Sequence, residues 1–146
     1  MREILFRGKR KDNGEWVEGN YIRQTLFYGE ETDRHWIMDI GEFDYDHYDS
    51  YIVIPETVGQ YTGLTDKNGT KIFEGDIVKA DEFIPTVSGI YEVIYDEVNH
   101  CYALERDIRY HFHYFTFSDL NGFQETSEVI GNIHDYHQPE KGGGQE

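Results

Sequence analysis

The chain is poor in cysteine, alanine, positive charge and long apolar runs, and each shortage excludes a class of protein. Cys101 is the only cysteine among 146 residues, so no internal disulfide can form and a stapled secreted scaffold is excluded. Alanine occurs only at Ala80 and Ala103, whereas aromatic residues make up 16% of the chain, so strand formers dominate. No apolar run has the about 20 residues that cross a bilayer or the form of a signal peptide. We expect a soluble, mainly β protein in a reducing cytoplasm, without membrane contact.

The charge of the chain is strongly one-sided. Asp and Glu number 29 against 13 Lys and Arg, which gives a formal net charge of −16. Such a field repels phosphate backbones, so direct nucleic-acid binding is not expected. The same charge would suit a basic protein partner, or a protein that mimics nucleic acid to block a basic host protein. A solvated acidic surface is the simplest interpretation.

A sequence phrase occurs twice, and each copy has an Asn-Gly pair between stretches rich in β-branched and aromatic residues. Asn-Gly supplies the positive φ values that a tight hairpin turn requires. Each copy therefore predicts a hairpin, followed by a bend or bulge at a second glycine. The turn residues are Asn13, Gly14 and Gly19 in the first copy and Asn68, Gly69 and Gly75 in the second.

Short apolar and aromatic runs between turn signals predict a chain of strands. A polar surface loop is expected at residues 29–34, and one helical turn at 118–120. The fold class is therefore mainly β, with small antiparallel barrel or sandwich lobes built from hairpins and little helix. The expected strands are 4–7, 15–23, 26–28, 36–40, 51–54, 89–96, 100–106, 110–117 and 128–133.

The composition along the chain predicts two lobes and a tail. Residues 1–58 are expected to form an N-terminal β lobe, and residues 59–138 a C-terminal β-barrel-like lobe that shares a core with the first. Residues 139–146 have too little apolar surface to order themselves, so we expect a disordered tail.

One continuous block carries a resemblance to a known family. It reads Pro55-Glu56-Thr57-Val58-Gly59-Gln60-Tyr61-Thr62-Gly63-Leu64 and continues through Asn68-Gly69 to Phe73-Glu74-Gly75-Asp76. Together with the opening Phe6-Arg7-Gly8 and the closing Glu128-Val129-Ile130-Gly131-Asn132-Ile133, this block resembles the YopX family of phage and prophage proteins. The resemblance implies a small, largely β protein, encoded by a phage or integrated element and acting in the bacterial cytoplasm. It supplies no catalytic residues to transfer.

The strongest pattern for chemistry is the pair His111 and His113. Histidines at i and i+2 on a strand point the same way and could share a metal ion. With a neighbouring carboxylate they would make the chain a metal-dependent hydrolase. A third ligand would have to come from elsewhere in the chain, so a structural or surface role is favoured for this pair, and no metal is expected.

Two further patterns favour no catalytic chemistry. Asp44, Asp46 and Asp49 lack the glycine and the terminal glutamate of the helix-loop-helix calcium motif, and we expect them to form an acidic loop that contacts a partner. Cys101 follows His100, and strand neighbours face opposite sides, so His100 is badly placed to activate the thiol.

The favoured hypothesis is a non-enzymatic accessory protein that presents a surface to a protein partner and forms a homo-oligomer. No catalytic residue and no cofactor are expected. The metal-dependent hydrolase and the acidic nucleic-acid mimic remain alternatives. Large aromatic side chains are expected in the core or at subunit contacts. They are Trp16, Tyr21, Trp36, Tyr61, Phe73, Tyr91 and Tyr95.

Overall fold

The computed structural model describes residues 1–39, 49–80, 89–108, 111–116 and 123–135, and for 107–108, 111–116 and 123 it describes the backbone alone. The described chain is mainly β with little helix, as predicted. Its strands form two open antiparallel sheets, so the barrel alternative is not realised by these strands. Within the described residues no helix combines the length and apolar character that crossing a bilayer requires. The expected helical turn at 118–120 and the tail at 139–146 lie outside the described residues.

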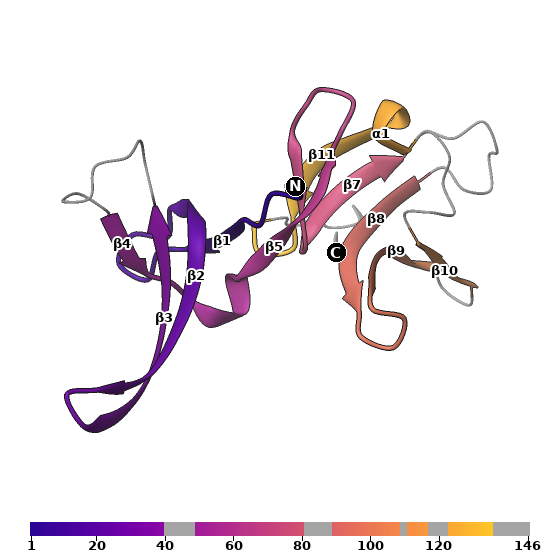
Figure 1. Cartoon of the computed structure of the whole chain (residues 1–146). Coiled ribbons are helices and arrows are strands. Elements are labelled where there is room, and N and C mark those ends of the chain that lie inside the picture. Colours follow the sequence, from indigo (N-terminus) through magenta and orange to yellow (C-terminus); the bar gives the residue numbers. More distant parts are fainter. Residues whose placement is uncertain (40–48, 81–88, 109–110, 117–122, 136–146) are drawn as a thin grey trace, which may run out of the picture.

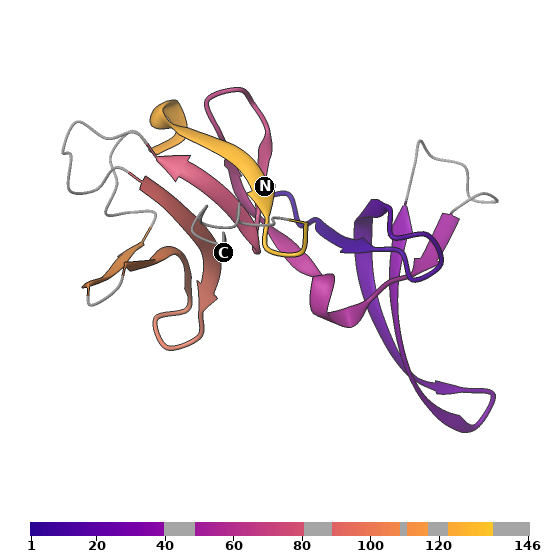
Figure 2. The same cartoon turned by 180° about the vertical axis from the view of Figure 1, so that it is seen from behind.

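The first sheet has six strands and the second has five, and Figures 1 and 2 show them extending in different directions from β5 and β7. The first sheet has the order β4 (Asp49–Ile52), β3 (Glu30–Asp39), β2 (Trp16–Phe27), β1 (Phe6–Lys9), β5 (Gly59–Thr65), β6 (Lys71–Phe73). The second has the order β10 (His111–Thr116), β9 (Cys101–Ile108), β8 (Gly89–Asp96), β7 (Asp76–Ala80), β11 (Ser127–Asn132). A 3-10 turn, η1 (Pro55–Thr57), and one helical turn, α1 (Phe123–Thr126), complete the described elements.

The two Asn-Gly pairs lie in hairpin loops, but only their glycines have positive φ. Gly14 has φ +73° and Gly69 has φ +79°. The loops close with a hydrogen bond of 2.8 Å from the Arg10 N–H to the Glu15 carbonyl, and one of 2.8 Å from the Asp66 N–H to the Thr70 carbonyl. Loops of this length end in one left-handed residue, which glycine adopts without strain. The tight turn with two positive φ values therefore does not form at these pairs.

That tight turn forms instead at Tyr28 and Gly29, with φ of 50° and 82°. Phe27 pairs with Glu30 directly across it. The loop predicted at residues 29–34 is therefore wrong, because β3 begins at Glu30 and runs through this polar stretch. Both faces of the β2–β3 hairpin are solvated near its tip, so the strand there needs no apolar alternation. A hydrogen-bonded ion pair connects the two strands, with Arg23 Nε 2.9 Å from Asp33 Oδ1.

The second glycine of each phrase has a different role in each copy. Gly19 pairs regularly with Phe6, without a bulge, and a Cβ there would lie 2.0 Å from the carbonyl oxygen of Met38. Gly75 has φ +88° and connects the sheets. Its N–H donates to the Val93 carbonyl at 2.8 Å, and its carbonyl accepts the Ile133 N–H at 2.9 Å. Gly19 thus allows close strand approach, whereas Gly75 makes a turn.

The main core lies on one face of the second sheet, where the β5–β6 hairpin covers it. Ile72 of β6 belongs to the first sheet by hydrogen bonding, yet it is fully buried against the second. By hydrogen bonding, the first sheet ends at Phe73 and the second begins at Asp76. The division into lobes at residues 1–58 and 59–138 with a shared core stays a prediction. The buried cluster comprises Ile72, Val78, Ala80, Tyr91, Val93 and Leu104.

Candidate functional site

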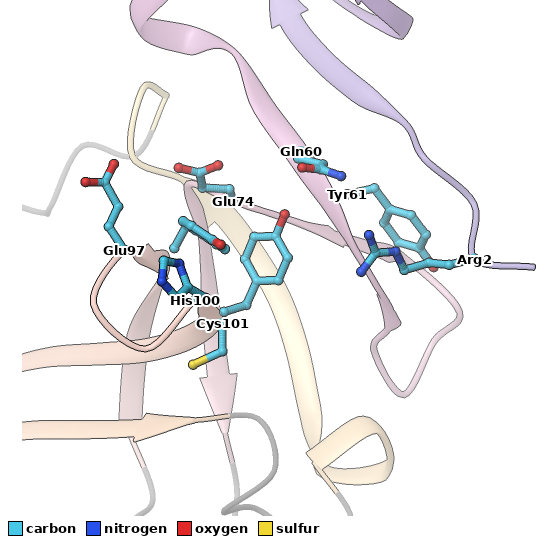
Figure 3. Close-up of a pocket in the computed structure, with 9 residues that line it drawn as sticks. Arg2, Gln60, Tyr61, Glu74, Glu97, His100 and Cys101 are labelled. Carbon is cyan, nitrogen blue, oxygen red and sulfur yellow. The ribbon is translucent and has the colours of Figure 1, made fainter.

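A cavity of about 650 Å³ lies between the two sheets, and we call it the inter-sheet cavity. Figure 3 shows Arg2 and Tyr61 on one side of it, Glu97 and His100 on the other, and Glu74 and Gln60 between them. Its walls thus come from the N-terminal segment, β5, the β6–β7 turn and the β8–β9 hairpin. The lining residues are Arg2, Gln60, Tyr61, Glu74, Tyr95, Glu97, His100, Cys101 and Tyr102.

Close backbone packing places Glu74 in this cavity. A Cβ at Gly59 would lie 2.5 Å from the Glu74 carbonyl oxygen, so only glycine allows β5 to approach so closely. The Glu74 N–H donates to the Gln60 carbonyl at 2.9 Å. The turn at Gly75 then reverses the chain into β7. The central block of the sequence therefore builds the floor of the cavity.

The cavity has one half-buried acid, Glu74, and one exposed acid, Glu97, beside phenol rings. Burial raises the pKa of Glu74, the negative charge of Glu97 raises it further, and a hydrogen bond with the Gln60 backbone opposes both. Burial also raises the pKa of Tyr102, as does the charge of Glu74, while the Arg2 charge lowers it. Such a lining favours cations and hydrogen-bond donors over anions.

A second surface is an exposed sheet face formed by β2, β3 and β4. Ile22, Trp36 and Ile52 are directly opposite one another on the three strands and make an apolar row across the sheet. Ile22 is 44% exposed and Ile52 36% exposed, whereas Ile37, on the opposite face, is fully buried. We call this surface, made by Ile22, Phe27, Trp36, Met38 and Ile52, the apolar face. A hollow of about 380 Å³ lies over part of it.

The predicted metal ligands and acidic loop are mostly beyond what the structure describes. The backbone of β10 places His111 opposite Ile108 and His113 opposite Arg106, but both side chains lie outside the described part. Asp44 and Asp46 lie outside the described residues, and Asp49 is exposed at the start of β4, opposite Asp39. Among the described residues, no three His, Cys, Asp or Glu side chains gather as metal ligands would.

His100 and Cys101 both line the inter-sheet cavity, which strand alternation did not predict. His100 is not in a strand: it has φ +54° at the end of the β8–β9 turn. The alternation rule therefore does not apply to it. No hydrogen bond joins the two side chains, and Figure 3 shows the Cys101 sulfur pointing away from Glu74.

Sequence reasoning missed the ion pair that connects the sheets. Arg7 of β1 donates from Nη2 to Asp76 Oδ1 of β7 at 2.6 Å, and Asp76 is 1% exposed. The Phe73 N–H donates to the other carboxylate oxygen at 2.7 Å. Burial raises the pKa of Asp76, and the Arg7 charge opposes this rise. The only signal in the sequence was that both residues lie in the blocks that carry the family resemblance.

The guanidinium of Arg7 also lies against two aromatic rings. Its Cζ is 4.7 Å from the Trp16 ring centroid and 4.8 Å from the Phe73 centroid. Nearby, Lys9 and the indole N–H of Trp16 both contact the carboxylate of Asp135, which follows β11. Trp16 and Phe73 both lie at the junction of the sheets. Phe73 is buried, as expected for a large ring in the core, whereas Trp16 is only half-buried.

Three comparisons relate the chain to known proteins. The chain is similar to the protein in the crystal structure of EF1440 from Enterococcus faecalis, with 23% identity over 92% of this chain and 95% of that chain, and a TM-score of 0.44. No curated protein matches it. The family model described as YopX protein matches residues 5–140. Because this match covers nearly the whole chain, the protein belongs to the YopX family.

Proposed function

We propose that this YopX family member is a non-enzymatic accessory protein, encoded by a phage or prophage, that works in the bacterial cytoplasm by docking to protein and associates with itself. The observation that carries the proposal is the apolar row of Ile22, Trp36 and Ile52, in which both isoleucines are exposed. The resemblance of the sequence to this family supports the proposed phage setting.

The energetics of the apolar face favour a protein contact. Burying one large aliphatic side chain contributes about 1.5–3 kcal/mol, and the face presents several such side chains around a tryptophan. Tryptophan is enriched among the residues that dominate binding energy at interfaces. Contiguous apolar patches on soluble proteins mark interaction sites. A partner that covers Trp36 and its neighbours would therefore gain most of its affinity there.

The charges around the apolar face favour a second copy of this chain as the occupant. The hollows over the face are lined by three basic side chains, Arg10, Lys11 and Arg23, and by one acidic side chain, Asp12. The whole chain has more than twice as many acids as bases. The lining of these hollows is thus less acidic than the chain as a whole, which lowers the repulsion of another acidic copy there. A two-fold contact between identical faces is the commonest form of homo-oligomer.

Sedimentation of two matched variants tests this proposal. Ile22→Lys adds a charge to the apolar face, and Ile90→Lys adds the same charge at a residue of β8 that is equally exposed, at 46% against 44%. We expect wild type and Ile90→Lys to sediment as dimers and Ile22→Lys as a monomer. A monomeric wild type at the highest attainable concentration, or equal dissociation of both variants, would refute self-association through this face.

A further inference from the structure

We propose that the inter-sheet cavity is a binding site for a guanidinium or primary ammonium group, presented by a basic side chain of a protein partner. This site is separate from the apolar face and does not depend on self-association. The cavity lies between β5 and the β8–β9 hairpin, whereas the apolar face lies on β2, β3 and β4. Each can therefore be tested without the other.

Two carboxylates make the cavity suitable for a cation. Glu74 is half-buried at its floor, and Glu97 stands on the β8–β9 turn within electrostatic reach. Burial and mutual repulsion both disfavour the charged form of Glu74. A cation placed between the two carboxylates would relieve both effects and form charge-assisted hydrogen bonds. A neutral ligand of the same shape would relieve neither.

Phenol rings are the second feature that suits the cavity to a cation. Tyr61, Tyr95 and Tyr102 all line the cavity, and the rings of Tyr95 and Tyr102 meet edge to face with centroids 5.3 Å apart. Aromatic faces attract ammonium and guanidinium groups. The Tyr61 ring already makes one such contact outside the cavity lining, because Lys71 Nζ lies 5.5 Å from its centroid. The combination of acids and phenols therefore selects a cation with an organic stem.

Arg2 indicates which cation fits. Its side chain lines the same cavity from the exposed N-terminal segment, and its charge lowers the pKa of Tyr102. The cavity thus already accepts a guanidinium at its rim. The volume of about 650 Å³ leaves room for a second side chain. Arg2 would repel and compete with that incoming cation, so its removal should strengthen binding.

Calorimetric titration with blocked amino acids tests the site. The probes are N-acetyl-arginine amide, its lysine counterpart, and the citrulline amide as a neutral analogue of arginine shape. We expect Glu74→Gln to weaken binding of the cationic probes by about tenfold or more, and Arg2→Ala to strengthen it. Glu30→Gln removes the same charge at the distant β2–β3 tip and should change affinity by less than about twofold, because screening weakens remote charges.

The outcomes separate the possibilities. Any of three results would overturn the proposal: the citrulline amide binds as tightly as the arginine probe, neither cationic probe binds, or Glu74→Gln and Glu30→Gln change affinity equally. Glu97→Gln provides a second variant with the same expected direction, and thermal unfolding checks that each variant is folded. Agmatine distinguishes the source: if it binds and the blocked arginine does not, the site takes a free small cation and the protein partner is refuted.

Discussion

At the scale of single residues, the most consequential contact is between Arg7 and Asp76. Asp76 is buried, the guanidinium of Arg7 lies against two aromatic rings, and the pair spans the junction of the sheets. Removing one partner of a buried ion pair leaves the other charge uncompensated, which lowers the free energy of unfolding by about 3–5 kcal/mol. We therefore predict that Asp76→Ala lowers the free energy of unfolding by about that amount, measured by chemical denaturation.

A double variant is the control for this prediction. Arg7→Met with Asp76→Leu removes both charges and keeps apolar contact with Trp16 and Phe73, so it should lose clearly less stability than Asp76→Ala alone. If Asp76→Ala were as stable as wild type, the ion pair would not be what holds the sheets together.

Removing the charge of Glu74 should stabilise the protein, whereas removing that of Asp76 should destabilise it. Burial raises the pKa of its carboxyl above the ordinary 4.5, so the folded state holds this proton more tightly than the unfolded state does. The contribution to stability is present below pH 4.5 and is lost as the pH rises through the folded-state pKa. We predict that Glu74→Gln is more stable than wild type at pH 7 and that its advantage shrinks toward pH 4.

Thermal unfolding across this pH range measures the effect. Glu30→Gln, at an exposed residue with the same charge change, should show no such pH-dependent gain. A gain for Glu74→Gln that stayed constant from pH 4 to pH 7 would show that the raised pKa is not its cause. The expected stability of Glu74→Gln also makes it a well-folded variant for the binding experiment.

At the scale of strands and turns, two glycines that look alike in the sequence differ physically. Gly14 has a positive φ, but a Cβ added to it would lie in open space. A Cβ added to Gly19 would lie 2.0 Å from the carbonyl oxygen of Met38. A left-handed non-glycine residue costs about 1–2 kcal/mol. We predict that Gly14→Ala lowers the free energy of unfolding by about that amount. Gly19→Ala should lower it by more, because β2 and β3 must move apart to admit the methyl group. Urea denaturation of both variants measures it, and equal losses would contradict the close approach.

The strands themselves were predictable where residues alternate over a buried core, as in β8 and β9. The polar stretch from Glu30 was not, because a strand exposed on both faces carries no apolar pattern. The turn at Tyr28-Gly29 carries the positive φ values that the two Asn-Gly pairs were expected to carry. Turn type depends on the register of the paired strands, and register is set by contacts that are not local.

At the scale of the whole molecule, the two sheets share a core and an ion pair. We predict that they unfold in one cooperative transition. The chain has two tryptophans, and Trp16 contacts Asp135 at the junction of the sheets. Fluorescence of Trp36 in a Trp16→Phe variant therefore reports the first sheet. Hydrogen exchange of the backbone amides in β8 and β9 reports the unfolding of the second sheet. The two probes should give the same midpoint of denaturation, and separate midpoints would show that the lobes fold independently.

The sequence by itself determined the class of fold, the family and the turns at Gly14, Gly69 and Gly75, because strand propensity and backbone φ are local properties. Only the tertiary structure decided which residues meet. Arg7 and Asp76 are 69 residues apart, and the inter-sheet cavity joins Arg2 with Glu74 and Glu97 from separate elements. No local pattern encodes such pairs, since the packing of one sheet against the other places these charges together.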